Sequence, residues 1–298
     1  MTTAAMPAPS GLDERVRRKP FLAVLFSGFP TIVGAALVGI AAFFAIFAPL
    51  IAPHDPNLQN LGGAFKPPAW LAGGSPANLL GTDDLGRDIF SRIVWGARVA
   101  AIVGLSGVAI GGSLGVALGI IAGYFGGIVD DVIARIADVQ FAFPSVLLAI
   151  AVVGVIGPSL TTVIVTIGIT GWVQYVRVVR AEALSLRERD FVQAAVATGA
   201  SLTRVLLWHV LPSIGSSITV LATFGVARAI ILESALSFLA LGVPQEITSW
   251  GAMLADGRQF LDTAWWLGLF PGLAIFLTVL GVNLFGDGLR DALDPHSR

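Results

Sequence analysis

Long runs of apolar residues, spaced along almost the whole chain, constrain its fold more than any other feature. A helix needs about 20 apolar residues to cross the hydrocarbon core of a membrane. Six runs reach or approach that length: Thr31–Ile51, Val99–Ala122, Phe143–Ile156, Leu160–Val176, Ile214–Leu241 and Ala264–Phe285. Charged residues make up only 12% of the chain, against about 25% in an average soluble domain. The sequence therefore predicts an all-α, polytopic membrane protein with about six transmembrane helices.

The third and fourth runs are the shortest, and they predict a hairpin within the membrane. Gly157, Pro158 and Ser159 separate them, and Gly-Pro pairs mark tight turns. Two connecting segments are long instead: residues 53–92 are rich in Pro, Gly and Asn, and residues 177–213 are polar but patterned. The other connections, including residues 124–139, are predicted to be short loops.

Lysine and arginine residues are distributed unequally between the predicted loops. With the N-terminus inside, the inside segments carry twelve of them: Arg15, Arg17, Arg18, Lys19, Arg135, Arg177, Arg180, Arg187, Arg189, Arg204, Arg290 and Arg298. The outside segments carry five: Lys66, Arg87, Arg92, Arg98 and Arg258. Because cytoplasmic loops carry the excess, both termini are predicted to be cytoplasmic. The first run is too long for a cleaved signal peptide, so we interpret it as a retained span.

Residue types needed for several kinds of chemistry are missing from the chain. It has no cysteine, and His54, His209 and His296 lack metal-ligand spacing. Its two lysines, Lys19 and Lys66, do not stand in the Gly-Lys-Ser/Thr context of a phosphate-binding loop. A net charge of -1 gives no field that would attract nucleic acid. We therefore expect no catalytic residue, no metal site, no cofactor bound by this chain and no nucleic-acid partner.

Charged residues occur in two unusual places. The cluster from Asp83 to Asp88 lacks the alternate-residue spacing of a calcium loop, and it reads as a solvated turn that opens a helix. Arg228 and Glu233 both lie inside the fifth apolar run. They are five residues apart, about 140° around a helix, so they cannot share a face. Ionisable residues within a membrane are functional candidates, with a structural pairing to another helix or subunit as the alternative.

Glycine recurs every fourth residue along the second run, at Gly107, Gly111, Gly115, Gly119 and Gly123. This spacing places the glycines on one face of a helix and lets a second helix approach closely. The face can serve either as a sliding or gating surface or as static packing. We favour static packing, because faces of small residues mostly just pack.

The long polar segment after the fourth run contains a short predicted helix, Phe191–Thr198. Asp190 is a candidate N-cap and Gly199 a candidate left-handed residue just after the helix. At helical spacing Phe191, Ala194, Ala195 and Thr198 form one face of mostly small residues. A second helical stretch, Leu202–Leu211, leads to Pro212. A short capped helix that projects from a membrane protein suits docking into a groove of a partner.

This segment resembles a known motif. Gln193-Ala194-Ala195, then Gly199, then Leu211-Pro212 is similar to the EAA loop of ABC importer permeases. Gln193 stands where the family pattern has Glu, and His209 where it has Ile. The form with His209 resembles the branch that imports peptides and, in some members, nickel.

The resemblance extends over nearly the whole chain. Further segments similar to dipeptide and oligopeptide permeases of the DppC/OppC type are Leu80–Asp88, Ser91-Arg92, Gly96–Arg98, Phe143–Ser145, Gly171-Trp172, Glu233–Leu239 and Gly286–Pro295. The resemblance implies a type I ABC importer permease fold. It implies a cytoplasmic tail (1–30), a first helix with an external loop (31–92), a permease domain (93–290) with the coupling loop 177–213, and a second cytoplasmic tail (291–298).

The resemblance also implies partners and site residues. A homologous DppB/OppB-type permease would complete the pathway in the plasma (inner) membrane. ABC ATPase subunits, which bind ATP and Mg, would dock on the coupling helix, and an extracytoplasmic peptide-binding protein would deliver substrate. The expected ATPase-docking residues are Asp190, Phe191, Gln193, Ala194, Ala195, Gly199, His209 and Pro212. The expected external docking residues are Gly81, Asp83, Gly86, Arg87 and Asp88.

Alternative functions predict other features. A nickel permease of the same branch is the nearest alternative, and few metal ligands in this chain do not exclude it, since a binding protein can carry the selectivity. An ion-coupled secondary transporter would have broken midplane helices and several membrane carboxylates, whereas only Glu233 fits. A membrane-embedded enzyme would need paired catalytic groups in the spans, and the runs contain none.

Overall fold

Helices form nearly all of the regular structure in the computed structural model, which describes residues 24–26, 28–244 and 246–293. Five are long and apolar enough to cross a membrane: α2 (Phe29–Ile51), α3 (Ile89–Phe125), α6 (Leu160–Arg187), α10 (Gly215–Phe238) and α12 (Trp266–Leu293). Within those ranges there is no strand, only an isolated bridge between Thr82 and Asp88. The all-α membrane prediction is confirmed. Most of the predicted N-terminal tail and residues 294–298 lie outside the described residues.

The third predicted run, Phe143–Ile156, corresponds to a helix that is too short to cross a membrane alone. Helix α5 (Ser145–Ile156) has only 12 residues. Before it, where a loop was predicted, lies helix α4 (Gly127–Phe141), and the two helices meet at 87°. Pro144 accounts for the break, because proline lacks an N–H group and disfavours a helical backbone at the residue before it. Together the two helices can count as a sixth, bent span.

The helices on either side of this pair are longer than their apolar runs. Helix α3 begins at Ile89, ten residues before the predicted Val99, and α6 continues to Arg187, eleven residues past Val176. The residues 177–187, predicted to begin a loop, are therefore helical. Charged residues such as Arg92 and Arg180 end an apolar run, but they do not end a helix.

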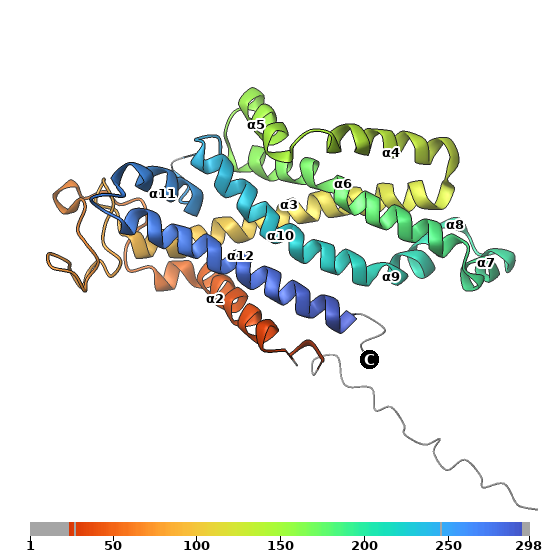
Figure 1. Ribbon diagram of the computed structural model, residues 1–298, viewed down its shortest axis with the longest axis horizontal. Coiled ribbons are helices and arrows are strands. Elements are labelled where there is room, and N and C mark those ends of the chain that lie inside the picture. Colours follow the sequence, from red (N-terminus) through yellow and green to blue (C-terminus); the bar gives the residue numbers. More distant parts are fainter. Residues whose placement is uncertain (1–23, 27, 245, 294–298) are drawn as a thin grey trace, which may run out of the picture.

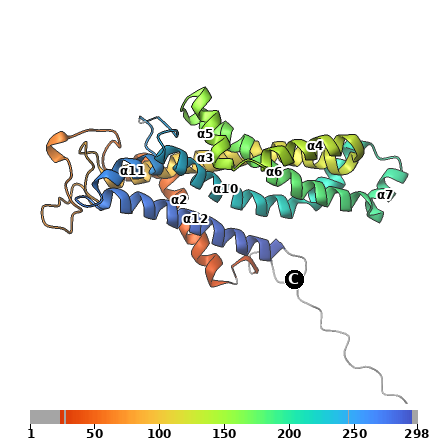
Figure 2. The ribbon, with the colours of Figure 1, turned by 45° about the horizontal axis from the view of Figure 1, so that its top comes forward.

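Helices α3 and α6 lie side by side and run parallel (Figures 1 and 2). The glycine stripe of α3 faces α6 along its length. A Cβ atom on Gly115 would lie 2.4 Å from the carbonyl oxygen of Trp172, and one on Gly123 would lie 2.5 Å from that of Arg180. The absence of side chains thus allows the two backbones to touch. This geometry supports the interpretation of the stripe as close packing.

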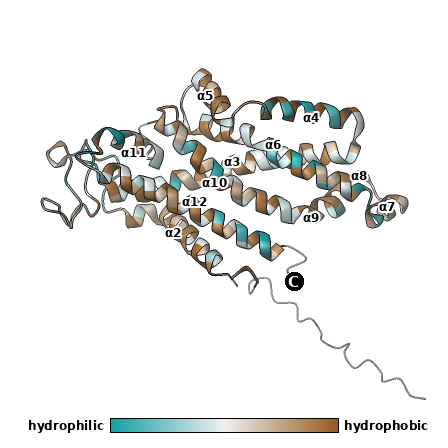
Figure 3. Ribbon diagram, viewed as in Figure 1, coloured by the Kyte–Doolittle hydropathy of each residue, from teal (hydrophilic) through white to brown (hydrophobic). Residues whose placement is uncertain are grey.

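The other spans pack on a second side of the bundle. Helix α12 lies against α2, where Gly34 and Gly281 allow the two backbones to approach, and α10 lies between α12 and α6 (Figure 1). Apolar residues dominate α2 and α10, while hydrophilic residues gather on α4 and on the last turns of α12 (Figure 3). The unpaired apolar surface of these spans is what lipid or another membrane subunit would cover.

The two ends of the bundle differ. At one end, here named the α11 end, lie the long α2–α3 segment (residues 52–88) and helix α11 (Trp250–Gly257) (Figure 1). At the opposite end, the α7 end, lie helix α7 (Asp190–Ala197), helix α8 (Leu202–Val205) and helix α9 (Leu211–Ser213). The start of α2 and the end of α12 point toward the α7 end, where Thr31 contacts the backbone beside Gly288.

Candidate functional site

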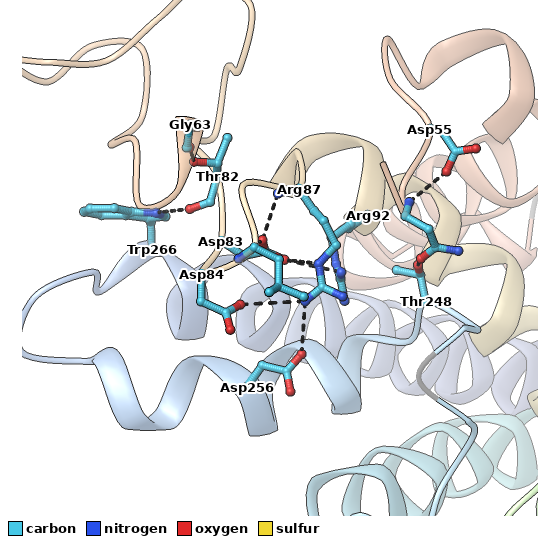
Figure 4. Close-up of polar contacts among 12 residues, drawn as sticks. Asp55, Gly63, Thr82, Asp83, Asp84, Arg87, Arg92, Thr248, Asp256 and Trp266 are labelled. Carbon is cyan, nitrogen blue, oxygen red and sulfur yellow. Dashed lines mark hydrogen bonds and ion pairs between the residues drawn. The ribbon is translucent and has the colours of Figure 1, made fainter. Parts of the chain in front are cut away.

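A cluster of buried charges holds the α11 end together (Figure 4). Asp83 is its centre: one carboxylate oxygen accepts the backbone N–H of Arg87 at 2.8 Å, and the other accepts the Arg87 Nε at 2.6 Å. Arg92 Nη1 lies 3.3 Å from the same carboxylate. Asp83, Arg87 and Arg92 are 4%, 8% and 3% exposed. The turn does open helix α3, as predicted. It is not solvated, because the charges of Asp83, Arg87 and Arg92 neutralise one another and are buried.

Asp88 begins helix α3 as its N-cap. Its carboxylate accepts the backbone N–H of Ser91 at 2.9 Å and the Ser91 hydroxyl at 2.7 Å, and it accepts a side-chain N–H from Asn78 at 2.9 Å. Two glycines make the turn before it possible. Gly81 and Gly86 have φ of +83° and +72°, and a Cβ atom on Gly86 would lie 1.9 Å from the carbonyl oxygen of Asn60. The α2–α3 segment is thus folded tightly onto the start of α3.

The cluster joins elements far apart in the sequence. Asp256 of α11 lies 3.5 Å from Arg87, and Trp266 of α12 donates from its indole to the carbonyl of Thr82 at 3.1 Å. Burial raises the pKa of the Asp256 carboxyl, while Arg92 and Arg87 beside it lower that pKa. The side chains of Asp83, Arg87 and Asp88 make their contacts within the chain. A docking role for this segment remains a prediction, and it would fall to the exposed surface around the cluster.

Helix α7 ends as predicted from its glycine. Gly199 has a φ of +83°. Its N–H donates to the carbonyl of Val196 at 3.0 Å, and the N–H of Ala200 donates to that of Ala195 at 3.1 Å, the paired pattern of a Schellman motif. The prediction of Asp190 as N-cap is wrong. Asp190 is already the first helical residue, and Arg189 before it has an extended backbone.

Val192 is the most deeply buried residue of α7, and Ala195 packs against the same cluster. Val192 is 1% exposed and packs with Ala183, Val205 and Val210. On the other side, Phe191 is 47% exposed, and Gln193, Ala194 and Thr198 are also exposed, while Ala195 is half-buried. Of the predicted face of α7, all but Ala195 therefore lies at the surface. Thr198 donates its hydroxyl to the carbonyls of Ala194 and Ala195 within the helix.

The stretch that follows brings His209 beside α7. The rings of Phe191 and His209 have their centroids 6.5 Å apart. His209 lies in a π-helical turn, Leu206–Val210, that comes just before Pro212. Proline inside an α-helix lacks an N–H group and clashes with the carbonyl four residues earlier, and a wider turn relieves that conflict. Neighbouring Leu207 and Trp208 are 52% and 75% exposed, which extends the apolar surface at this end.

Glu233 is a structural residue of the α11 end. It is 2% exposed, and it accepts a hydrogen bond from the Ser237 hydroxyl at 2.7 Å. Ser249, the N-cap of α11, donates to Ser237 at 3.4 Å. The chain between them turns tightly, since a Cβ atom on Gly242 would lie 1.8 Å from the Ser237 hydroxyl oxygen. Glu233 thus fixes the loop between α10 and α11, and it forms no ion pair with Arg228 in the described residues.

Arg228 lies in a different environment, at a cavity in the middle of the bundle. The cavity has a volume of about 120 Å³. Its walls come from α3, α6 and α10, with Ser145 of α5 at one side. The polar side chains that line it are Ser145, Thr170, Gln174, Tyr175 and Arg228. A second cavity, of about 270 Å³, shares Ser145, Thr170 and Gln174 with it. We name the first one the central cavity.

Contacts between α4 and α6 were not predicted from the sequence. Two nitrogens of the Arg180 guanidinium donate to the two carboxylate oxygens of Asp130 and form an ion pair. The indole of Trp172 donates to Gln140 Oε1 at 2.7 Å. No helix was predicted at α4, although Asp131, Arg135 and Asp138 recur at helical spacing among apolar residues. In the described part of the chain, no three His, Cys, Asp or Glu side chains gather as a metal site.

Comparisons with known proteins place the chain among membrane transport components. A family model described as "Binding-protein-dependent transport system inner membrane component" matches residues 115–298. A second, "N-terminal TM domain of oligopeptide transport permease C", matches residues 31–68.

Individual relatives match over most of their length. The chain is 46% identical to the dipeptide transport system permease protein DppC of Escherichia coli (strain K12), over 89% of this chain and 88% of that protein. It is 43% identical to the di/tripeptide transport system permease protein DppC of Pseudomonas aeruginosa, over 88% and 86%. It is 40% identical to the probable D,D-dipeptide transport system permease protein DdpC of Escherichia coli (strain K12), over 91% and 89%.

Proposed function

The chain belongs to the family of binding-protein-dependent transport system inner membrane components, and from that membership we propose that it is the permease subunit of an ATP-driven importer of dipeptides and oligopeptides. It forms half of a translocation pathway in the inner membrane, and a homologous permease forms the other half. ATP and Mg bind to partner ATPase subunits, because the chain has no phosphate-binding loop of its own. An extracytoplasmic binding protein delivers the peptide.

The observation that carries this proposal is helix α7. It is short, closed by a Schellman motif, and anchored by the buried Val192, while Phe191 and Ala194 stay exposed. A rigidly held helix with an unpartnered outer face suits a groove on another protein. We infer that the α7 end is cytoplasmic, that both termini lie on that side, and that α7 couples ATP binding to the reorientation of the spans.

The test compares three variants of α7 with a control variant on α6. Ala194→Asp places a charge on the exposed face of α7, and Ala195→Asp places one at its half-buried edge. A charge left without a partner in an interface costs several kcal/mol. Gly199→Val forces a β-branched residue into a left-handed backbone, which costs about 1–2 kcal/mol and turns the helix. Ser185→Asp, at an exposed position of α6, is the matched control.

The measurement is peptide uptake and ATPase stimulation in proteoliposomes that contain the whole complex. Ala194→Asp, Ala195→Asp and Gly199→Val should lose both, and Ser185→Asp should keep both. If the three α7 variants assemble and retain stimulated ATPase activity and uptake, the coupling role of α7 is refuted. If the wild-type complex imports no peptide, the proposed function is refuted.

The described carboxylates give no support to an ion-coupled secondary transporter. Such a transporter needs ionisable groups that face the pathway. Glu233 instead is buried among serine hydroxyls at the α11 end, and the lining of the central cavity contains no carboxylate.

A further inference from the structure

The central cavity lies at mid-height of the bundle. Its walls include Gly107 and Gly111 from the middle of α3, Thr170 from the middle of α6, and Arg228 from the middle of α10. Residues at half the length of a spanning helix lie near the centre of a bilayer. The cavity is thus far from either surface of the membrane.

Arg228 is an unusual residue for this position. An arginine at the centre of a spanning helix costs about 2.5–3.5 kcal/mol on insertion scales. Such residues usually pair with another charge or face water or substrate. Arg228 is exposed, and within the described residues it has no ion pair and no hydrogen bond. Its charge is therefore uncompensated inside this chain.

The neighbours of Arg228 keep the cavity open and polar on one side. Tyr175 lies close enough to interact electrostatically with the guanidinium, and its hydroxyl donates to the carbonyl of Leu221 at 3.4 Å. A Cβ atom on Gly225 would lie 2.6 Å from that hydroxyl oxygen, so glycine is needed there for the tyrosine to fit. Gln174 adds an amide to the same wall.

We propose that Arg228 binds the carboxylate of a peptide as it passes through the central cavity, an inference that rests on the proposed function. A guanidinium binds a carboxylate through two parallel hydrogen bonds. Tyr175 and Gln174, which also line the cavity, can bond the peptide backbone.

The lining of the central cavity also argues against a bare metal cation as the transported substrate. A cationic side chain in a pore raises the electrostatic barrier to cations. The lining of the central cavity offers no carboxylate, imidazole or thiolate to replace the water around a divalent ion. Of the two substrates left open by the sequence, peptide and nickel, the cavity fits the peptide.

The absence of cysteine in the native chain permits a direct test. Arg228→Cys is introduced into the complete complex, with any cysteines of the partner subunits replaced, and uptake of alanyl-alanine is measured in proteoliposomes with binding protein and ATP. Uptake should fall roughly tenfold or more, the loss of one charge-assisted contact. A methanethiosulfonate reagent that attaches a trimethylammonium group should restore a large part of it, and one that attaches a sulfonate should not. Arg135→Cys, at an exposed position of α4, is the control. Its uptake should not change with either reagent.

Each outcome decides the proposal. Uptake at the wild-type rate in Arg228→Cys, or equal effects of the two reagents, overturns it while leaving the permease function intact. If Arg228→Cys does not assemble, the comparison passes to Arg228→Lys and Arg228→Gln. The Arg228→Lys variant must then keep the uptake that Arg228→Gln loses. Equal uptake rates of the two variants overturn the proposal. Failure of the wild-type complex to import alanyl-alanine, or uptake of nickel ions in its place, points instead to failure of the proposed function.

Discussion

Replacing Gly115 by alanine tests how closely α3 and α6 must pack. The new methyl group would lie 2.4 Å from the carbonyl oxygen of Trp172 and 2.6 Å from the Cβ atom of Tyr175. The nearer contact is 0.6 Å inside the 3.0 Å limit that real Cβ atoms respect. Neither atom can rotate away, because one belongs to the backbone and the other is attached to it. The two helices must therefore separate.

The cost can be isolated with a control on the same helix. Overpacking of a close interface costs about 1–3 kcal/mol, while exchanging glycine for alanine in a helix gains up to about 1 kcal/mol. Gly112 is also buried, but a Cβ atom there would lie 3.5 Å from its nearest neighbour, Tyr175, an ordinary contact. Gly112→Ala therefore carries the gain without the clash. The difference between the two variants should be about 1–3 kcal/mol.

The assay is the heat stability of the purified complex in detergent, read as the fraction that stays monodisperse after heating. Gly115→Ala should lose the complex at a lower temperature than wild type, and Gly112→Ala at the same or a higher temperature. If Gly115→Ala is as stable as Gly112→Ala, then α3 and α6 do not pack as closely as described here, and the role of the stripe must be sought elsewhere.

Two further predictions follow from the ends of the bundle. Asp83→Asn should reduce the yield of assembled complex, because removing one member of a buried charge cluster costs about 3–5 kcal/mol. Asp84→Asn, whose side chain is 32% exposed, should reduce the yield much less. A normal yield of Asp83→Asn together with impaired docking of the binding protein would contradict the structural role of Asp83. A single cysteine introduced by Asn60→Cys should react with an impermeant maleimide from outside intact cells, and one introduced by Ser185→Cys only after the cells are opened; the reverse pattern would overturn the orientation.

Local patterns predicted local structure well. Gly199 was expected to end a helix in a left-handed conformation, and the hydrogen bonds of Val196 and Ala200 show why a glycine stands there. The spacing of the glycines on α3 likewise indicated a packed face, since helical periodicity alone places them together. The existence of five spans followed from the apolar runs in the same way.

Contacts between distant segments could not be predicted. The Asp83–Arg87 pair is buried because Asp256 and Trp266, more than 160 residues away in sequence, cover it, and nothing near Asp83 signals that cover. The sequence analysis did not predict helix α4, because hydropathy measures the transfer of residues into lipid and α4 contains charged residues. Its charges instead pair with α6, as Asp130 does with Arg180.

The glycine contact between α3 and α6 has a mechanical consequence. Helix α6 has 28 residues, which makes it about 42 Å long at 1.5 Å per residue, and only Glu188 and Arg189 separate it from α7. Bound tightly to its neighbour, it cannot bend easily and acts as a stiff lever. A tilt of about 5° would displace its far tip by about 4 Å, given that length. Under the proposed coupling role, we therefore expect a displacement of α7 to pass along α6 and, through the glycine contact, to α3.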